Sequence, residues 1–326
     1  LDHQYAFQDM EYSSYNLFST NVDSLHIVDG PEITIRSFTG EDDIVEHSFR
    51  NSNHDLFNGS SVLGYNGNIY ICGGGSGKSK SPSLTEYDPI DQHCRSLSPM
   101  PQARDAFALV ATPDDSLYVL GGRSVSGLAN AQSFKYDIRN DSWTTIEPLP
   151  RGVFDHSAAC HVNGINYVLF VFGGRTDDSW NSQIWAYNFN SWHFKLRMKN
   201  WEAIPLNEGK LSISNPCRSL SLLSGEILIL QSTGRNFLFN VNNFCVQTLK
   251  SSKEQLSLEG STWGYDSFND RYVINTWNKE IYYDAKAKKF TIKKKMETTE
   301  NVYEVEYLDD SDTETSSQEG DTSLVQ

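Results

Sequence analysis

The sequence predicts an all-β protein, a six-bladed β-propeller followed by a disordered acidic tail. Three observations lead to this prediction. A short apolar segment that ends in a glycine pair occurs three times. The pairs ending at Gly74, Gly122 and Gly174 are 48 and 52 residues apart, the size of a four-stranded blade. The roughly 308 residues before the tail divide into six such units, a number at which propellers close.

The three glycine pairs each end a strand that is predicted to be buried. The segments are NIYICGG (68–74), SLYVLGG (116–122) and VLFVFGG (168–174). Glycine suits a sharp turn where neighbouring backbone leaves no room for a side chain. A tyrosine follows each pair by 13 or 14 residues, and a second residue follows the tyrosine by seven, which gives Tyr87 with Cys94, Tyr136 with Trp143, and Tyr187 with Phe194. We expect these residues to pack between blades.

Weaker copies of the same frame flank the three clear ones. Residues 227–230 and 272–275 repeat the apolar strand, and residues 25–36 indicate a degenerate first unit. The spacing of seven returns in Phe239 with Val246 and in Tyr283 with Phe290. We predict two regions, a propeller over 1–308 and a disordered acidic tail over 309–326. Within the propeller we expect a degenerate first blade (1–58), three clear repeats (59–205), two degenerate blades (206–295) and a closing strand within 296–308.

The net charge of −15 belongs to the two ends of the chain. Residues 1–58 carry −9, residues 59–295 carry +4 and residues 296–326 carry −10. Six lysines between 286 and 295 form a basic cluster just before the acidic tail. The cluster can be read as a nucleic-acid contact or as a solvated outer strand balanced by the tail, and the low overall pI favours the second interpretation.

The glycine pairs, the tyrosine frame and the unit length resemble the kelch repeat, most specifically over residues 60–205. The resemblance implies a protein-binding platform, and many similar propellers are substrate receptors of cullin-type ubiquitin ligases, tethered through a BTB–BACK or F-box region. Residues 1–58 do not look like such a region, so a cullin would be reached through sequence missing upstream. The expected partner is a protein ligand with an acidic segment.

In propellers of this type the binding surface is formed by loops after the glycine pairs and before the next first strand. Arginine and tryptophan suit such a surface, because guanidinium groups bind carboxylates bidentately and indoles fill pockets. Carried over to this sequence, the resemblance implies partner-binding roles for Arg104, Arg123, Arg151, Asp155, His156, Arg175, Trp180, Arg218 and Trp263. A structural role is equally expected for Arg104 and Arg151, and His156 is more typical of a structural histidine. Replacing Arg123, Arg151 and Arg175 by Glu is predicted to weaken binding without unfolding the protein.

No catalytic site is predicted. The motifs H-E-x-x-H, G-x-S-x-G and G-x-x-x-x-G-K-[ST] are absent, as are the metal-binding patterns of catalytic kelch proteins, so we expect no metal and no cofactor. Two alternatives stay open. One is a nuclear cofactor of DNA recombination or transposition, similar in layout to the kelch accessory subunit of the V(D)J recombinase. The other is a sugar-binding propeller similar to the sialic acid mutarotases.

Cysteine usage and hydropathy indicate where the protein works. The five cysteines form no C-x-x-C pair, which favours reduced thiols over a disulfide framework. No apolar stretch approaches the length of a membrane span, and no signal peptide is visible at the start of the given sequence. We therefore expect a cytoplasmic or nuclear protein without a membrane partner.

Overall fold

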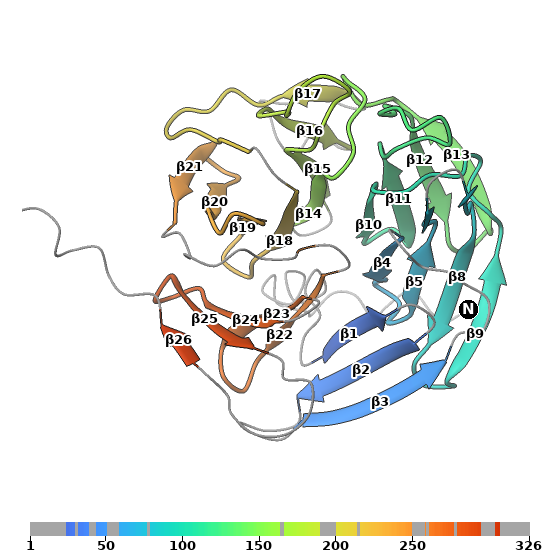
Figure 1. The fold of residues 1–326 in the computed structure, drawn as a ribbon, viewed down its shortest axis with the longest axis horizontal. Coiled ribbons are helices and arrows are strands. Elements are labelled where there is room, and N and C mark those ends of the chain that lie inside the picture. Colours follow the sequence, from blue (N-terminus) through green and yellow to red (C-terminus); the bar gives the residue numbers. More distant parts are fainter. Residues whose placement is uncertain are drawn as a thin grey trace, which may run out of the picture.

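The computed structural model shows β-sheets arranged as a ring around a central axis (Figure 1). The structure describes residues 24–29, 32–38, 44–50, 59–76, 79–163, 166–189, 200–213, 216–249, 258, 261–276, 279–294 and 304–306. The predicted tail, 309–326, lies outside these residues. No helix long and apolar enough to cross a membrane occurs in the part of the chain that the structure describes.

Five sheets of this ring have the four or more antiparallel strands of a complete blade. The first consists of β4 (Ser60–Leu63), β5 (Ile69–Cys72), β8 (Leu84–Asp88) and β9 (His93–Leu97), with a separate hairpin of β6 (Gly75–Ser76) and β7 (Ser79–Lys80). The second consists of β10 (Ala108–Thr112), β11 (Ser116–Leu120), β12 (Ser133–Asp137) and β13 (Ser142–Ile146). The third consists of β14 (Ser157–Asn163), β15 (Asn166–Phe172), β16 (Ile184–Asn188) and β17 (Trp201–Ala203).

The remaining two blades follow along the chain. The fourth consists of β18 (Cys217–Ser221), β19 (Glu226–Gln231), β20 (Phe237–Asn240) and β21 (Cys245–Thr248). The fifth consists of β22 (Thr262–Asp266), β23 (Arg271–Asn275), β24 (Lys279–Asp284), β25 (Lys289–Lys294) and β26 (Glu304–Glu306). We call these sheets blades one to five, and the first strand of each lies nearest the axis (Figure 1).

The prediction of six blades is wrong, because the N-terminal region forms a smaller sheet. Its strands are β1 (Ser24–Asp29), β2 (Glu32–Phe38) and β3 (Ile44–Arg50), paired in the order β1-β2-β3. A fourth strand is not found in this sheet among the described residues. The described residues therefore form five blades and a three-stranded sheet. The weak repeat signal of residues 25–36 correctly indicated strands but overestimated their number.

The three-stranded sheet lies between blade five and blade one, where two adjacent residues of β2 contact the two neighbours. Ile35 packs against the hydrophobic cluster of Ile69, Ile71 and Tyr87 in blade one. Arg36 forms an ion pair with Glu280 of blade five and a hydrogen bond of 2.6 Å to Glu46 of β3. Because successive strand residues point to opposite faces of a sheet, β2 can hold both neighbours at once.

Replacing Arg36 by Ala is expected to loosen this sheet while the five blades stay folded. Its side chain is 15% exposed and that of Glu280 is 13% exposed, so Glu280 would lose its charge partner in a half-buried position. We expect faster amide hydrogen exchange in β1 to β3, measured by mass spectrometry. Replacing the exposed Arg139 by Ala should leave the exchange of these strands unchanged. Equal protection of β1 to β3 in wild type and the Arg36 variant would contradict this account.

Sequence patterns explain which strands become central. In β11 and β15 almost every residue is buried, because neighbouring blades cover both faces of these strands. Their sequences are therefore continuous apolar runs and not alternating ones. The outermost strand β13 is mostly exposed and carries Ser and Thr. Hydrophobic clusters accordingly lie between blades, as where Phe170 and Phe172 of blade three meet Phe239 of blade four.

The predicted tyrosine frame is the pairing register of the third and fourth strands. Tyr87 pairs with Cys94, Tyr136 with Trp143, Phe239 with Val246 and Tyr283 with Phe290. In blade three the prediction of Phe194 is wrong, because Tyr187 pairs with Trp201; Phe194 itself lies outside the described residues. A longer connection in this blade shifts the partner. The indole nitrogen of Trp201 donates to the carbonyl oxygen of Glu147 in the preceding connection at 3.0 Å, just as that of Trp143 donates to Ser98 at 2.7 Å.

The segment expected to supply a closing strand lies on blade five. Its described part, β26, pairs antiparallel with β25, with Glu304 opposite Lys293. An acidic strand thus lies next to the lysine-rich strand. Two of the clustered lysines also have partners within the ring, since Lys286 pairs with Asp270 and Lys288 donates to Gln247 at 2.8 Å. These contacts support the interpretation of the cluster as part of an outer strand and its turn; the tail that was expected to balance it lies outside the described residues.

Candidate functional site

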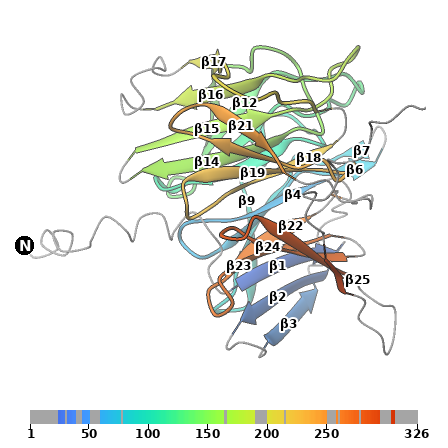
Figure 2. The ribbon, with the colours of Figure 1, turned by 90° about the vertical axis from the view of Figure 1, so that its left-hand side faces the viewer.

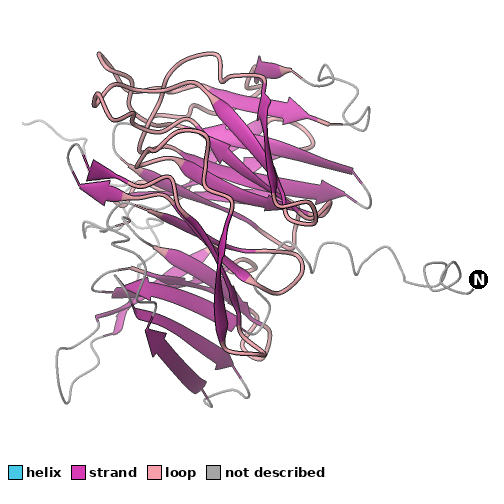
Figure 3. Ribbon diagram, turned by 90° about the vertical axis from the view of Figure 1, so that its right-hand side faces the viewer, coloured by secondary structure: helices cyan, strands magenta, loops and turns pink. Residues whose placement is uncertain are grey.

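The antiparallel order of each blade decides which connections share one end of the ring. The loops after the second strand and the connections between blades lie at one end, and the turns after the first and third strands lie at the other. We call the first end the loop face; it carries residues 73–76, 79–83, 98–107, 121–132, 147–156 and 173–183. We call the second end the turn face. In Figure 2 the hairpin of β6 and β7 marks the loop face, and Figure 3 shows its loops beside the strands.

Two equivalent backbone clamps shape the loop face in blades two and three. Asp105 and Arg123 exchange hydrogen bonds of 3.2 and 2.8 Å between their main chains, and Phe154 and Arg175 do the same at 3.0 and 2.7 Å. Each clamp joins the connection that enters a blade to the loop that follows its glycine pair. The amide of Asp155 donates to the carbonyl of Ala106 at 3.0 Å and links the two clamps. The repeated sequence frame thereby holds both loops in the same orientation.

A buried ion network supports the first clamp. The Asp105 side chain is fully buried and accepts hydrogen bonds from Arg123 at 3.1 and 2.8 Å. Lys80, whose side chain is 1% exposed, forms an ion pair with the same carboxylate. Burial raises the pKa of the Asp105 carboxyl, but the hydrogen bonds from Arg123 and Lys80 outweigh this effect, so the pKa lies below its usual value. Arg123 therefore has a structural role, because its guanidinium group already pairs with Asp105 within the protein.

Arg104 takes the structural role that the sequence left open for it. Its side chain is fully buried and donates to the carbonyl oxygens of Gly121 and Gln132, both at 2.8 Å. The guanidinium carbon also lies 4.6 Å from the ring centroid of Phe134. Burial lowers the pKa of Arg104 to about 10. A partner protein cannot reach this group without opening blade two.

His156 is a packing residue between two glycine pairs. A side chain at Gly121 would meet its Cε1 atom at 2.9 Å, and one at Gly174 would meet its Cβ atom at 2.5 Å. Phe107 holds the equivalent place between Gly73 and Gly122. Burial and the nearby charge of Arg218 lower the pKa of His156 to about 3, so the ring stays neutral near neutral pH.

Three further predicted site residues lie beside these packed positions. Asp155 is half-buried with a φ of 55°, a left-handed conformation that Asp tolerates. Arg218 is half-buried in β18 and donates to the carbonyl of Cys217 at 3.0 Å. Trp263 is half-buried in β22, packs on the cluster between blades four and five, and lies 6.5 Å from the ring of Tyr272.

The structure brings Arg123, Arg175 and Trp180 together, and the charge of Arg151 acts on Asp178 in the loop that carries Arg175 and Trp180. The ring of Phe154 lies between two of them, with the guanidinium carbons of Arg123 and Arg175 at 5.5 and 5.9 Å from its centroid. Arg175 and Arg151 are exposed, and Trp180 is half-buried in a backbone bridge with Arg175. A guanidinium group over an aromatic ring can still present its edge to a carboxylate, as that of Arg123 does to Asp105.

The loop 123–130 of blade two completes this group. Its main chain bridges Arg123 to Ala129, and the Ala129 amide donates to Asp177 of blade three at 2.9 Å. A side chain at Gly152 would meet the Ala129 carbonyl at 2.7 Å, so this loop lies against the residue that follows Arg151. We define the arginine surface as Arg151, Arg175 and Trp180 with the adjoining loop 123–130.

Sequence reasoning missed Phe154 and the apolar residues Val125 and Leu128. Phe154 occupies the repeat position of Asp105, and an alignment of the clamps would have found it. Val125 and Leu128 are 50% and 57% exposed. Their signal in the sequence was the presence of two aliphatic residues within one short polar loop.

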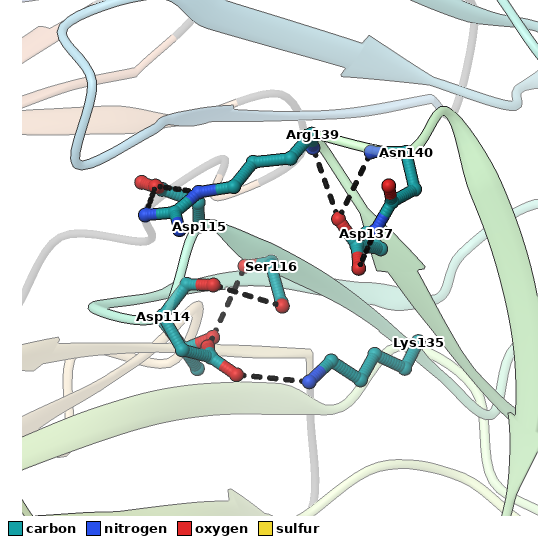
Figure 4. Close-up of polar contacts among 8 residues, drawn as sticks. Asp114, Asp115, Ser116, Lys135, Asp137, Arg139 and Asn140 are labelled. Atoms are coloured by element: carbon teal, nitrogen blue, oxygen red, sulfur yellow. Dashed lines mark hydrogen bonds and ion pairs between the residues drawn. The ribbon is translucent and has the colours of Figure 1, made fainter.

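The turn face of the same blade differs, because its charged side chains pair with one another (Figure 4). Arg139 Nε donates to Asp115 at 2.8 Å, and Lys135 donates to Asp114 at 2.8 Å. These pairs join the turn after β10 to strand β12 and the turn that follows it. Arg139 is nevertheless highly exposed, which makes it a matched control for the arginines of the loop face.

No group of three or more His, Cys, Asp or Glu side chains that could hold a metal ion occurs among the described residues. All five cysteines are free thiols, and Cys72, Cys160 and Cys217 are buried. Burial raises the pKa of the Cys217 thiol to about 12. The three buried thiols are therefore protonated packing residues near neutral pH.

Comparison with known proteins finds relatives of part of this chain. Kelch-like protein 41 of Rattus norvegicus is 32% identical over 128 residues, which are 37% of this chain and 20% of that protein. Kelch-like protein 33 of Homo sapiens is 33% identical over 109 residues, 32% of this chain and 19% of that protein. Over these residues the chain is similar to kelch-like proteins. The predicted resemblance is thereby confirmed.

The match covers only part of each molecule. Kelch-like protein 36 of Mus musculus is 30% identical over 146 residues, 43% of this chain and 22% of that protein. The chain thus spans about a fifth of the length of the curated relatives it matches. No protein-family model matches the chain. A solved structure titled "Structure of YjhT" aligns with a TM-score of 0.48 at 15% identity, over 70% of this chain and 83% of that one, which is too distant to support an inference.

Proposed function

We propose that this kelch propeller is a non-catalytic interaction module that binds a protein ligand through the arginine surface. The observation that carries the proposal is the pair of exposed guanidinium groups of Arg151 and Arg175 on the loop face. Arg175 is held by its backbone clamp and lies over the ring of Phe154. A fixed guanidinium loses less side-chain entropy when it binds a carboxylate, which favours a partner with acidic residues.

The local charges indicate short-range recognition of the acidic segment. Asp177 and Asp178 belong to the same loop as Arg175, but Asp177 accepts from the Ala129 amide and Asp178 accepts from Thr176 at 2.6 Å. Both carboxylates are thus engaged within the loop face. Because the surface carries both signs, we expect bidentate contacts at the two arginines and only weak long-range attraction.

The partner is proposed to be a substrate of a ubiquitin ligase. The support is the family, since kelch propellers that resemble this one serve as substrate receptors of cullin-type ligases. In this proposal the arginine surface recognises the substrate, and the cullin is reached through sequence outside the propeller. A cullin captured together with the natural full-length protein would support this role.

The direct test is affinity capture from cell lysate with three forms of the chain: wild type, R151E/R175E and the control R139E. Arg123 is left intact because Arg123→Glu would place a second carboxylate beside buried Asp105. We expect R151E/R175E to lose partners by tenfold or more in quantitative mass spectrometry, because each reversal opposes an acidic ligand. R139E should retain them. Equal recovery with R151E/R175E and wild type, both correctly folded, would refute the proposed surface.

A further inference from the structure

The loop 123–130 presents two apolar side chains next to the exposed arginines. Among the described residues, only Ile90, Val125, Leu128 and Phe268 are large exposed hydrophobics. Two of these four therefore lie within one short loop. Ile90 and Phe268 lie in the turns of other blades, on the turn face.

This loop is held rigidly by its own hydrogen bonds. The Ser124 amide donates to the Leu128 carbonyl at 2.9 Å, and the Gly127 amide donates to the Ser124 carbonyl at 2.9 Å. The hydroxyl of Ser124 contacts that of Ser126 at 2.7 Å. Gly127 allows the tight turn with a φ of 84°. Val125 and Leu128 are thus displayed by a preorganised turn, which lowers the entropy lost when a partner covers them.

Exposed ion pairs alone supply little binding free energy, because water and side-chain entropy offset most of the attraction. The two acids near Arg151 and Arg175 reduce the long-range attraction further. Strong binding at this surface consequently requires an apolar contact that removes area from water. The loop 123–130 is the part of the arginine surface that offers one.

We propose that Val125 and Leu128 form the apolar anchor of the arginine surface, and that the partner segment carries apolar side chains beside its carboxylates. This inference rests on the proposed function and specifies its ligand. The anchor adjoins Gly152 and Asp177 through Ala129, so one short segment can cover the aliphatic pair and reach Arg151 or Arg175. A purely acidic segment would leave Val125 and Leu128 in water and bind weakly.

The test selects ligands from a displayed library of random twelve-residue peptides against the full chain. Selected peptides are then measured against wild type, V125S/L128S, R151E/R175E and the matched control I90S, which removes an 89% exposed aliphatic residue from the turn face. Thermal melting confirms that each variant is folded. We expect selected peptides that combine Asp or Glu with Leu, Ile, Phe or Trp. V125S/L128S should weaken them about tenfold, and I90S should change their affinity by less than about twofold.

The outcomes separate the two proposals. Peptides that depend on Arg151 and Arg175 but bind V125S/L128S as well as wild type would overturn the apolar anchor and leave the proposed function standing. Peptides that are insensitive to both double variants, or the selection of no binding peptide, would overturn both. Selected peptides without apolar residues would contradict the anchor directly.

Discussion

Replacing Asp105 by Asn is expected to lower the free energy of unfolding by about 3 kcal/mol. Asn keeps the volume of the side chain but removes the charge that Lys80 and Arg123 share. The Lys80 ammonium would stay in an almost fully buried position without a counter-charge, which is the expensive part of breaking such a pair. Urea unfolding followed by tryptophan fluorescence measures the change.

The effect of Asp105→Asn on stability should depend on pH. Because the pKa of Asp105 in the folded protein lies below its unfolded value, its contribution is present above about pH 4 and is lost as the pH falls through the folded pKa. The difference between wild type and Asp105→Asn should therefore shrink on acidification. Arg139→Ala, which removes an exposed ion pair on the turn face, should have little effect at any pH. An Asp105→Asn variant as stable as wild type at neutral pH would show that the network does not stabilise the ring.

Replacing Gly122 by Val is expected to prevent folding or to destabilise the ring by about 4 kcal/mol or more. The Gly122 backbone has a φ of 99°, which a β-branched residue adopts only with strain. In addition, a Cβ atom would lie 2.7 Å from the Phe107 Cβ and 2.8 Å from the Asp105 carbonyl oxygen. These contacted atoms belong to the backbone and the packed core, so they cannot move aside without opening the clamp of blade two.

Gly127→Val separates these two causes. Gly127 has a φ of 84° but no atom within 4 Å of an added Cβ, so this variant adds backbone strain alone, about 1–2 kcal/mol. Thermal unfolding by circular dichroism should show a small loss for Gly127→Val and a large one for Gly122→Val. Similar losses in both variants would show that the close approach at the glycine pair contributes little, and would contradict the repeat geometry.

Much of the fold could be predicted because the repeat constrains the backbone locally. The glycine pair needs positive φ values, and the spacing of seven between Tyr136 and Trp143 is the register of a tight antiparallel turn. Where the connection lengthens, as before Trp201, the same spacing misleads. The prediction of six blades was wrong for a related reason. Residues 25–36 have the pattern of strands whether their sheet contains three strands or four.

The candidate site was predicted less well, because partner choice among charged side chains depends on tertiary distances. The sequence indicates that Arg104 and Arg123 lie in loops, but it does not indicate their partners. In the structure Arg104 donates to Gly121 and Gln132, and Arg123 pairs with Asp105. Arg151 and Arg175 were expected on the surface and are exposed there. Val125 and Leu128 could not be assigned to this surface from the sequence, because their loop contacts Gly152 and Asp177, which are distant along the chain.

We propose that the partner binds the loop face at the arginine surface. The most direct measurement places a photo-crosslinking amino acid at Leu128 or, as the control, at Ile90 on the turn face, and analyses the adducts formed in cells. We expect a protein adduct from position 128, and we expect this adduct to disappear when R151E/R175E is introduced into the same chain. From position 90 we expect no adduct that depends on these two arginines. Adducts from position 90 alone, or adducts from position 128 that ignore the arginine substitutions, would contradict the proposal.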